Sequence, residues 1–303
     1  MSRLAISNIA WDAKADEAMY ALLKRAGYTG LEIAPTRLFP ERPYECCGQM
    51  EREAGRLKEE YGLAVVSMQS IWYGRTERLF GSGQERDILL GYTRQAIDFA
   101  ASAGCKNLVF GSPKNRIRQG GAREEEVEAF FREAGEYASE RGTCLAMEAN
   151  PKIYGTDYIN RTEEAFELAK RVGSAGFRVN LDLGTVIENG ERIEDLEKEM
   201  NWVHHIHISE PHLAAIAHRS LHKELADMLR QVAYPGYVSI EMGRQEPAKQ
   251  APTRREPVKQ TPPRQEPAKQ APTRQEPSKQ TPPRQEPGGA VEEAIWYVKE
   301  IFG

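Results

Sequence analysis

Short apolar runs alternate with longer amphipathic segments along most of the chain. The runs are short and bounded by turn residues, which is typical of β-strands, whereas the longer segments carry apolar residues at helical spacing. The predicted strands cover residues 4–7, 30–34, 64–69, 107–110, 143–148, 177–182, 203–207 and 237–241. The predicted helices cover residues 16–25, 44–61, 84–103, 124–141, 162–172, 193–200, 221–232 and 291–302.

This alternation predicts an α/β fold with a parallel sheet. Glycines at positions 27, 62 and 104 follow three of the helices, as expected for helix C-caps. An open doubly wound sheet is the competing arrangement, but it needs no particular number of units. Eight strand–helix units are the number that a (β/α)8 TIM barrel needs, so we expect residues 1–303 to form a single barrel domain.

One segment, residues 245–287, differs from the rest. It repeats with a period of ten residues, is rich in Pro and Gln, and contains almost no large apolar side chain. Such a segment cannot bury a core, so we expect a disordered or polyproline-II insertion between strand eight and helix eight. It is either a partner-binding arm or cover, or a tolerated repeat expansion with no role in the chemistry.

Composition narrows the possible functions. The net charge of −4 is mild, which argues against nucleic-acid and membrane partners. No apolar stretch is long enough to span a membrane, and the N-terminus lacks a signal-peptide core, so we expect a cytoplasmic protein. The four cysteines, at positions 46, 47, 105 and 144, form neither a disulfide framework nor a zinc motif and are expected to be free thiols. A homo-oligomer is one of the assemblies that the sequence allows.

Four candidate metal ligands stand at the ends of four predicted strands. They are Glu148, Asp182, His207 and Glu241. A parallel barrel gathers the C-terminal ends of its strands at one mouth, so these side chains are expected to meet there. Three carboxylates and one imidazole would bind a divalent metal ion: Mn, Mg, Co or Zn.

The expected chemistry follows from this ligand set. An ion held by four protein ligands can also take substrate oxygens, and it would act as a Lewis acid on a carbonyl and stabilise an enediolate. Glu148 and Glu241 are the expected catalytic acid and base, one removing a carbon-bound proton and the other returning it. The predicted partner is therefore a small-molecule sugar or polyol substrate.

Other residues near the expected mouth are candidate substrate contacts. They are Glu32, Gln69, Trp72, Asn150, Glu210 and His222. Strand alternation places His205 on the same face as His207, as a core or supporting residue, and His204 outward under a helix. Lys114 and Arg116, after strand four, would either bind a carboxylate or phosphate or form a solvated cationic loop.

Five short motifs resemble one known family. They are Gly-Leu-Glu-Ile (30–33), Met-Glu-Ala-Asn (147–150), Asn-Leu-Asp-Leu-Gly-Thr (180–185), His-Ile-His-Ile-Ser-Glu (205–210) and Ser-Ile-Glu-Met (239–242). The chain is similar to the sugar-phosphate isomerase/epimerase group of the xylose isomerase-like TIM-barrel superfamily. The resemblance implies that Glu148, Asp182, His207 and Glu241 bind the metal and that both glutamates move the proton.

The chain also departs from relatives at three positions. It has Thr185 where many relatives have His, Tyr154 where ketose epimerases have Glu, and Leu213 where they have Arg. No His precedes His204, which argues against the multi-zinc endonuclease branch. Three functions are thus expected in order: a metal-dependent isomerase or epimerase, a dehydratase (lyase) similar to inosose dehydratase, and a non-catalytic metal- or sugar-binding protein.

Overall fold

Eight parallel strands close into a barrel. A computed structural model describes residues 2–245 and 289–303, and its strands pair in sequence order, with β8 returning to β1. The strands are β1 Arg3–Ser7, β2 Gly30–Ile33, β3 Ala64–Met68, β4 Leu108–Phe110, β5 Leu145–Glu148, β6 Phe177–Asp182, β7 Val203–Ile208 and β8 Tyr237–Ile240. The predicted TIM barrel is confirmed.

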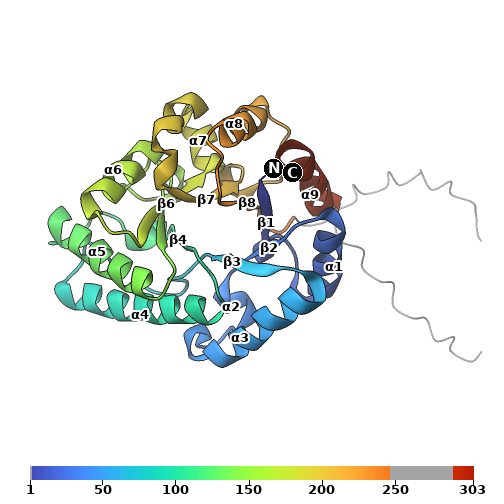
Figure 1. Cartoon of the computed structure of the whole chain (residues 1–303). Helices are drawn as coiled ribbons and strands as arrows, with labels where there is room; N and C mark the ends of the chain where they lie inside the picture. Colours follow the sequence, from blue (N-terminus) through green and yellow to red (C-terminus); the bar gives the residue numbers. More distant parts are fainter. Residues whose placement is uncertain (1, 246–288) are drawn as a thin grey trace, which may run out of the picture.

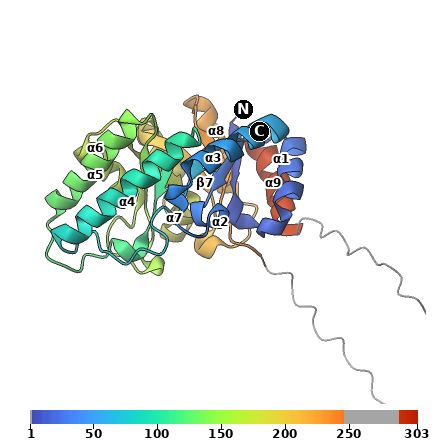
Figure 2. The same ribbon diagram turned by 90° about the horizontal axis from the view of Figure 1, so that it is seen from below.

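Helices surround the barrel (Figure 1). They are α1 Asp16–Ala26, α2 Pro35–Leu38, α3 Cys47–Arg56, α4 Gly83–Ser102, α5 Glu124–Glu140, α6 Thr162–Val172, α7 Leu183–Asn189, α8 Ser220–Gln231 and α9 Gly289–Phe302. The two chain ends lie side by side (Figure 2), where the amide of Ser2 donates to the carbonyl of Phe302 at 2.9 Å. No helix among the described residues is long and apolar enough to cross a membrane.

Local sequence signals explain several helix ends. Ser82 and Glu85 form a capping box at the start of α4, in which each side chain accepts from the other residue's amide, at 3.2 and 2.8 Å. Gly27 ends α1 in the left-handed conformation, with φ +79°, and its amide donates to the carbonyls of Leu23 and Lys24.

Three expectations about the elements need correction. The helix expected over 44–61 begins at Cys47, because Pro43–Glu45 forms a separate 3-10 turn, and it ends in a π-helical turn. The segment Ile193–Trp202 buries its apolar residues as expected but is a 3-10 helix. The helix α7 was not predicted; it begins because the Asp182 side chain accepts from the amide of Thr185 at 2.8 Å.

Of the insertion predicted at 245–287, all but Gln245 lies outside the described residues.

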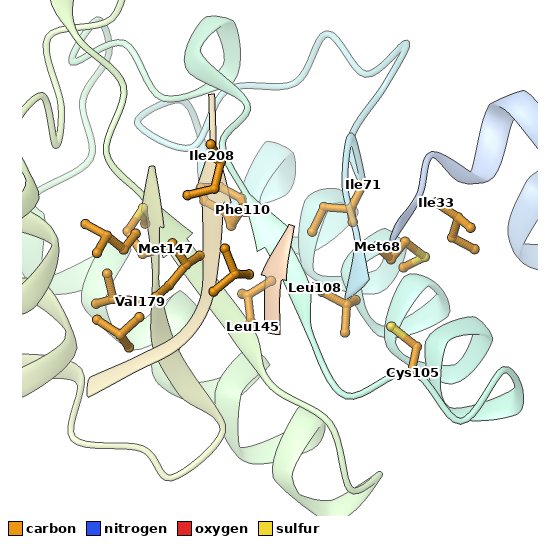
Figure 3. Packing of buried hydrophobic residues seen from close by; sticks show 14 of the residues in the cluster. Ile33, Met68, Ile71, Cys105, Leu108, Phe110, Leu145, Met147, Val179 and Ile208 are labelled. Carbon is orange, nitrogen blue, oxygen red and sulfur yellow. The ribbon is translucent and has the colours of Figure 1, made fainter. Parts of the chain in front are cut away.

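The apolar core lies between the strands and the helices. Strand residues such as Leu108, Phe110, Met147, Val179 and Ile208 are fully buried there, and Figure 3 shows them among the packed apolar side chains. Successive residues of a strand point to opposite sides, so the residues between them face the barrel axis.

Polar side chains form hydrogen bonds with one another inside the barrel. Gln69 on the β3 side donates to Ser7 Oγ of β1 at 2.9 Å, and Asn107 next to β4 donates to Ser67 Oγ of β3 at 2.9 Å. Barrel interiors are usually filled by branched apolar residues. This interior instead contains hydrogen-bonded polar side chains. The site described below lies at the mouth of this polar interior.

Candidate metal centre

The structure brings Glu148, Asp182, His207 and Glu241 together. Glu148 and Asp182 end β5 and β6, His207 lies one residue before the end of β7, and Glu241 directly follows β8. One potential ligand atom from each residue lies within 4.8 Å of the others, and all four side chains are largely buried. The strand-end argument therefore places these residues correctly.

The imidazole of His207 is oriented by three carboxylates. Its Nδ1 lies 3.0 Å from Glu148 Oε1 and 3.1 Å from Glu241 Oε2, whereas its Nε2 lies 2.9 Å from Glu32 Oε2. A carboxylate on one ring nitrogen commonly fixes the tautomer that presents the other nitrogen to a metal. Nδ1 is thus the atom of His207 that would face a cation.

Each carboxylate of the cluster has further partners. Asp182 accepts from Thr185 Oγ1 at 2.9 Å and from the hydroxyl of Ser209. Glu148 accepts from Asn180 Nδ2 at 2.8 Å and from Asn150 Nδ2 at 3.1 Å, and Glu241 accepts from Gln69 Nε2 at 2.8 Å. The carboxylate oxygens are therefore held in place by neutral donors.

Burial and neighbouring charges shift the pKa values of the residues in the cluster. Burial, reinforced by the charge of Glu148, raises the pKa of Asp182 to about 6. Burial also raises the pKa of Glu241 to about 7. Burial alone would lower the pKa of His207, but the charges of Glu241 and Glu32 raise it well above its usual value. A protonated imidazole is therefore the internal counter-charge of these carboxylates.

This donor set fits a divalent cation. Carboxylate oxygens with one imidazole nitrogen suit Mn, Mg, Co or Zn, and the surrounding amide and hydroxyl donors hold the oxygens in position. A bound cation would replace the proton of His207 as the counter-charge. Glu148, Asp182, His207 and Glu241 are the residues that would hold it.

The cluster opens into a cavity of about 190 Å³. Three of the expected substrate contacts, Gln69, Asn150 and Glu210, line it. Its full lining is Gln69, Ser70, Val109, Gly111, Ser112, Pro113, Glu148, Asn150, Tyr154, Asp182, Ser209, Glu210, Leu213 and Glu241.

The other three expected substrate contacts do not line the cavity. The carboxylate of Glu32 is fully buried beneath His207. Trp72 packs edge-on against Phe110 and Phe130, and its indole N–H donates to Thr93 Oγ1 at 2.8 Å, so its ring lies in the outer apolar core. His222 is buried on α8, with Nδ1 2.9 Å from the hydroxyl of Tyr297 on α9.

His205 lies where it was expected, whereas His204 and Arg116 do not. His205 supports the site as expected, with Nε2 3.2 Å from Glu32 Oε2. His204 does not pack under a helix: its Nδ1 lies 3.0 Å from Asn107 Oδ1, because the β6–β7 register shifts between Val179 and Asn180. Arg116 is fully buried rather than part of a solvated loop, and it donates to Asn150 Oδ1 at 2.7 Å and to the carbonyl of Glu148 at 2.9 Å.

Sequence reasoning missed the roles of Asn180 and Ser209 and did not foresee the buried role of Arg116. Asn180 precedes Asp182 by two positions on β6, so strand alternation alone would have placed both on the barrel axis. Ser209 lies two positions beyond His207 and follows the same rule. Nothing local distinguishes Arg116, because its partners lie more than thirty positions further along the chain.

The family is shown by comparison with known proteins. The model of the xylose isomerase-like TIM barrel matches residues 20–262, and the chain therefore belongs to this family. A comparison with curated protein sequences gave no match.

Several solved structures share the fold. The 3-keto-D-glucoside 4-epimerase of E. coli has a TM-score of 0.64 at 16% identity, covering 81% of this chain and 94% of that one. D-Psicose 3-epimerase from Clostridium cellulolyticum H10 has a TM-score of 0.64 at 14% identity, covering 82% and 87%. A family 2 AP endonuclease from Brucella melitensis has a TM-score of 0.65 at 22% identity, covering 81% and 95%. At these identities the likeness shows the fold alone.

Proposed function

We propose that the protein is a divalent-metal-dependent isomerase or epimerase of a sugar or polyol derivative. The observation that carries the proposal is that Glu148 and Glu241 enter one cavity beside the same imidazole nitrogen, at 3.0 and 3.1 Å from His207 Nδ1. The names of the epimerases that share the fold support this reaction class.

The cation would be held by Glu148, Asp182, His207 and Glu241. When bound, it supplies Lewis acidity to a substrate carbonyl oxygen, which acidifies the neighbouring C–H bond.

The two glutamates supply the proton transfer. Glu148 and Glu241 come from non-adjacent strands, β5 and β8, so a substrate carbon between them has a carboxylate available on each side. One carboxylate removes the carbon-bound proton and the other delivers a proton, which inverts the carbon or moves the carbonyl. The amide donors Asn150, Asn180 and Gln69 hold these oxygens in place, so little reorganisation is needed during the transfer.

Hydrogen–deuterium exchange tests the proposal. Protein loaded with Mn²⁺ is incubated in heavy water with a panel of free and phosphorylated ketoses and with inososes, and C–H exchange is followed by NMR. We expect exchange into at least one compound, lost on chelation and reduced at least 100-fold in Glu148→Gln and Glu241→Gln. Glu133→Gln, an exposed carboxylate on α5 that pairs with Arg94, is the matched control and should exchange like the wild type.

Three results would count against the proposal. Exchange that persists in both active-site variants would remove the glutamates from the mechanism. Exchange that survives complete chelation would remove the cation. A substrate that loses water, instead of exchanging its C–H hydrogen, would point to a dehydratase built on the same residues.

A further inference from the structure

Among the residues that the structure describes, the walls of the cavity carry no positive side chain. Among the described residues that line it, four are acidic, Glu148, Asp182, Glu210 and Glu241, and none is Lys or Arg. Proteins usually hold a phosphate group with Arg, Lys or the free N–H groups of a helix N-terminus. The described lining therefore lacks the cationic side chains with which proteins usually hold a phosphate ester.

The helix N-terminus nearest the cluster is also occupied. At the start of α7, the amide of Gly184 donates to Ser209 Oγ at 2.8 Å, and the amide of Thr185 donates to Asp182 Oδ2 at 2.8 Å. These N–H groups serve the metal ligand and its neighbour, so they are not free for a substrate anion.

Two of the described arginines near the cavity have other partners. Arg116 is fully buried, is not part of the lining, and donates to Asn150 Oδ1 and to the carbonyl of Glu148. Arg219 forms a two-pronged ion pair with Glu210, at 2.7 and 2.6 Å, which neutralises that carboxylate. Lys114 is exposed and is not part of the lining.

The remaining lining offers few hydrogen bonds to a polyhydroxylated chain. Val109, Pro113 and Leu213 contribute apolar surface, and Tyr154 contributes a ring whose hydroxyl accepts from the amide of His212 at 2.8 Å. The amide nitrogen of Asn150 is engaged with Glu148, and the hydroxyl of Ser70 donates to Gln69 Oε1 at 3.0 Å. The hydroxyls of Ser112 and Tyr154 are therefore the main donors that the lining leaves for a substrate.

The cavity is also small. Its volume of about 190 Å³ is below the roughly 300–1,000 Å³ of sites for drug-sized ligands. A compact molecule of a few carbons fits such a space better than an extended ester.

We infer that the substrate is a compact, uncharged carbonyl compound, not a phosphate ester, and that its part remote from the cation carries few hydroxyl groups. This inference rests on the proposed function for the reaction, but the charge and polarity of the walls carry it independently.

The test compares matched ligands on the Mn²⁺-loaded protein. Free ketopentoses and ketohexoses, their terminally deoxygenated forms, and their terminal phosphate esters are each assayed for C–H exchange in heavy water and for binding by calorimetry. We expect kcat/KM for exchange to be at least 100-fold higher for each free sugar than for its phosphate ester. The deoxygenated forms should match or exceed the parent sugars.

The variant Leu213→Arg sharpens the test. Leu213 lines the cavity, and its carbonyl accepts a hydrogen bond from the amide of Gly243 at 2.8 Å. This bond holds the backbone, so a new side chain at position 213 becomes part of the cavity wall. We expect Leu213→Arg to reduce the preference for the free sugar at least tenfold, whereas Leu213→Met leaves it unchanged.

The outcomes separate the two proposals. A phosphate ester that exchanges as fast as, or faster than, its free sugar overturns the inference and leaves the proposed function standing. If no compound exchanges, the proposed function fails, and calorimetry still decides the inference: tighter binding of the free sugars supports it, and tighter binding of the esters overturns it.

Discussion

Glu241 links the charge of the site to the stability of the fold. Burial raises its pKa from 4.5 to about 7 in the metal-free protein. In the unfolded chain the group keeps its ordinary pKa, so between about pH 4.5 and pH 7 the folded protein binds more protons than the unfolded one. The contribution of Glu241 to the free energy of unfolding therefore falls as the pH rises through this window.

The variant Glu241→Gln measures this contribution. A shift from 4.5 to about 7 corresponds to at most about 3.5 kcal/mol, because one pKa unit is worth about 1.4 kcal/mol. The substitution also removes one of the carboxylates that raise the pKa of His207, which offsets part of the gain. We expect the metal-free variant to become more stable relative to the wild type by about 1–3 kcal/mol between about pH 4.5 and pH 7, with little change above.

The free energy of unfolding must be compared between the variant and the wild type, because other buried groups of the wild type also change protonation in this pH range. Burial lowers the pKa of His204 and of His222 to about 4. These groups stay neutral in the fold while the unfolded chain binds protons, so their contribution to stability rises with pH between about 4 and 6.5, opposite to that of Glu241. Both histidines are present in both proteins, so their contributions cancel in the difference.

Urea unfolding followed by circular dichroism provides the assay. Chelated wild type and Glu241→Gln are unfolded at several pH values from about 5 to 8, and the series is repeated with saturating Mn²⁺. With Mn²⁺ the order should reverse, because the variant lacks a ligand. A stability difference that is flat with pH, or that shrinks as the pH rises, would refute the assignment of a strained, buried carboxylate to this position.

Three further predictions concern residues around the cluster. Glu32→Gln should weaken Mn²⁺ binding about 10- to 100-fold, as measured by chelator competition, because the carboxylate that orients His207 is lost; affinity equal to that of Glu133→Gln would contradict this role. Arg116→Met should lower the free energy of unfolding by about 2–4 kcal/mol, because Asn150 Oδ1 and the carbonyl of Glu148 lose their donor, while Arg118→Met, which changes an exposed arginine, should cost little. Trp72→Phe should cost about 1–3 kcal/mol through the lost hydrogen bond to Thr93 and leave C–H exchange intact; slower exchange would return Trp72 to the substrate site.

The parts of the site that the sequence predicted are those that depend on strand position alone. Glu148, Asp182 and His207 stand at or near strand ends, and a barrel brings such ends together whatever the side chains are. The same reasoning misplaced Glu32, which lies one residue before the end of β2 but is buried beneath the imidazole of His207. Trp72 and His222 were misplaced for a related reason: they lie beyond the strands, in a loop and on a helix, where tertiary packing decides which way a side chain points.

Glu32 belongs to a row of buried polar side chains that follows the barrel axis. Glu241, His207, Glu32 and His205 form a continuous chain of close contacts, at 3.1, 2.9 and 3.2 Å, that runs inward from the mouth. Buried charged groups destabilise a fold unless they are paired, and each member of this chain pairs with the next. The apolar layer under the helices must therefore supply the stability, while the axis fixes the orientation of the metal ligands before any cation or substrate arrives. Because the two layers share strands but not side chains, substitutions in the outer layer should change stability more than metal affinity, and substitutions along the axis should do the opposite.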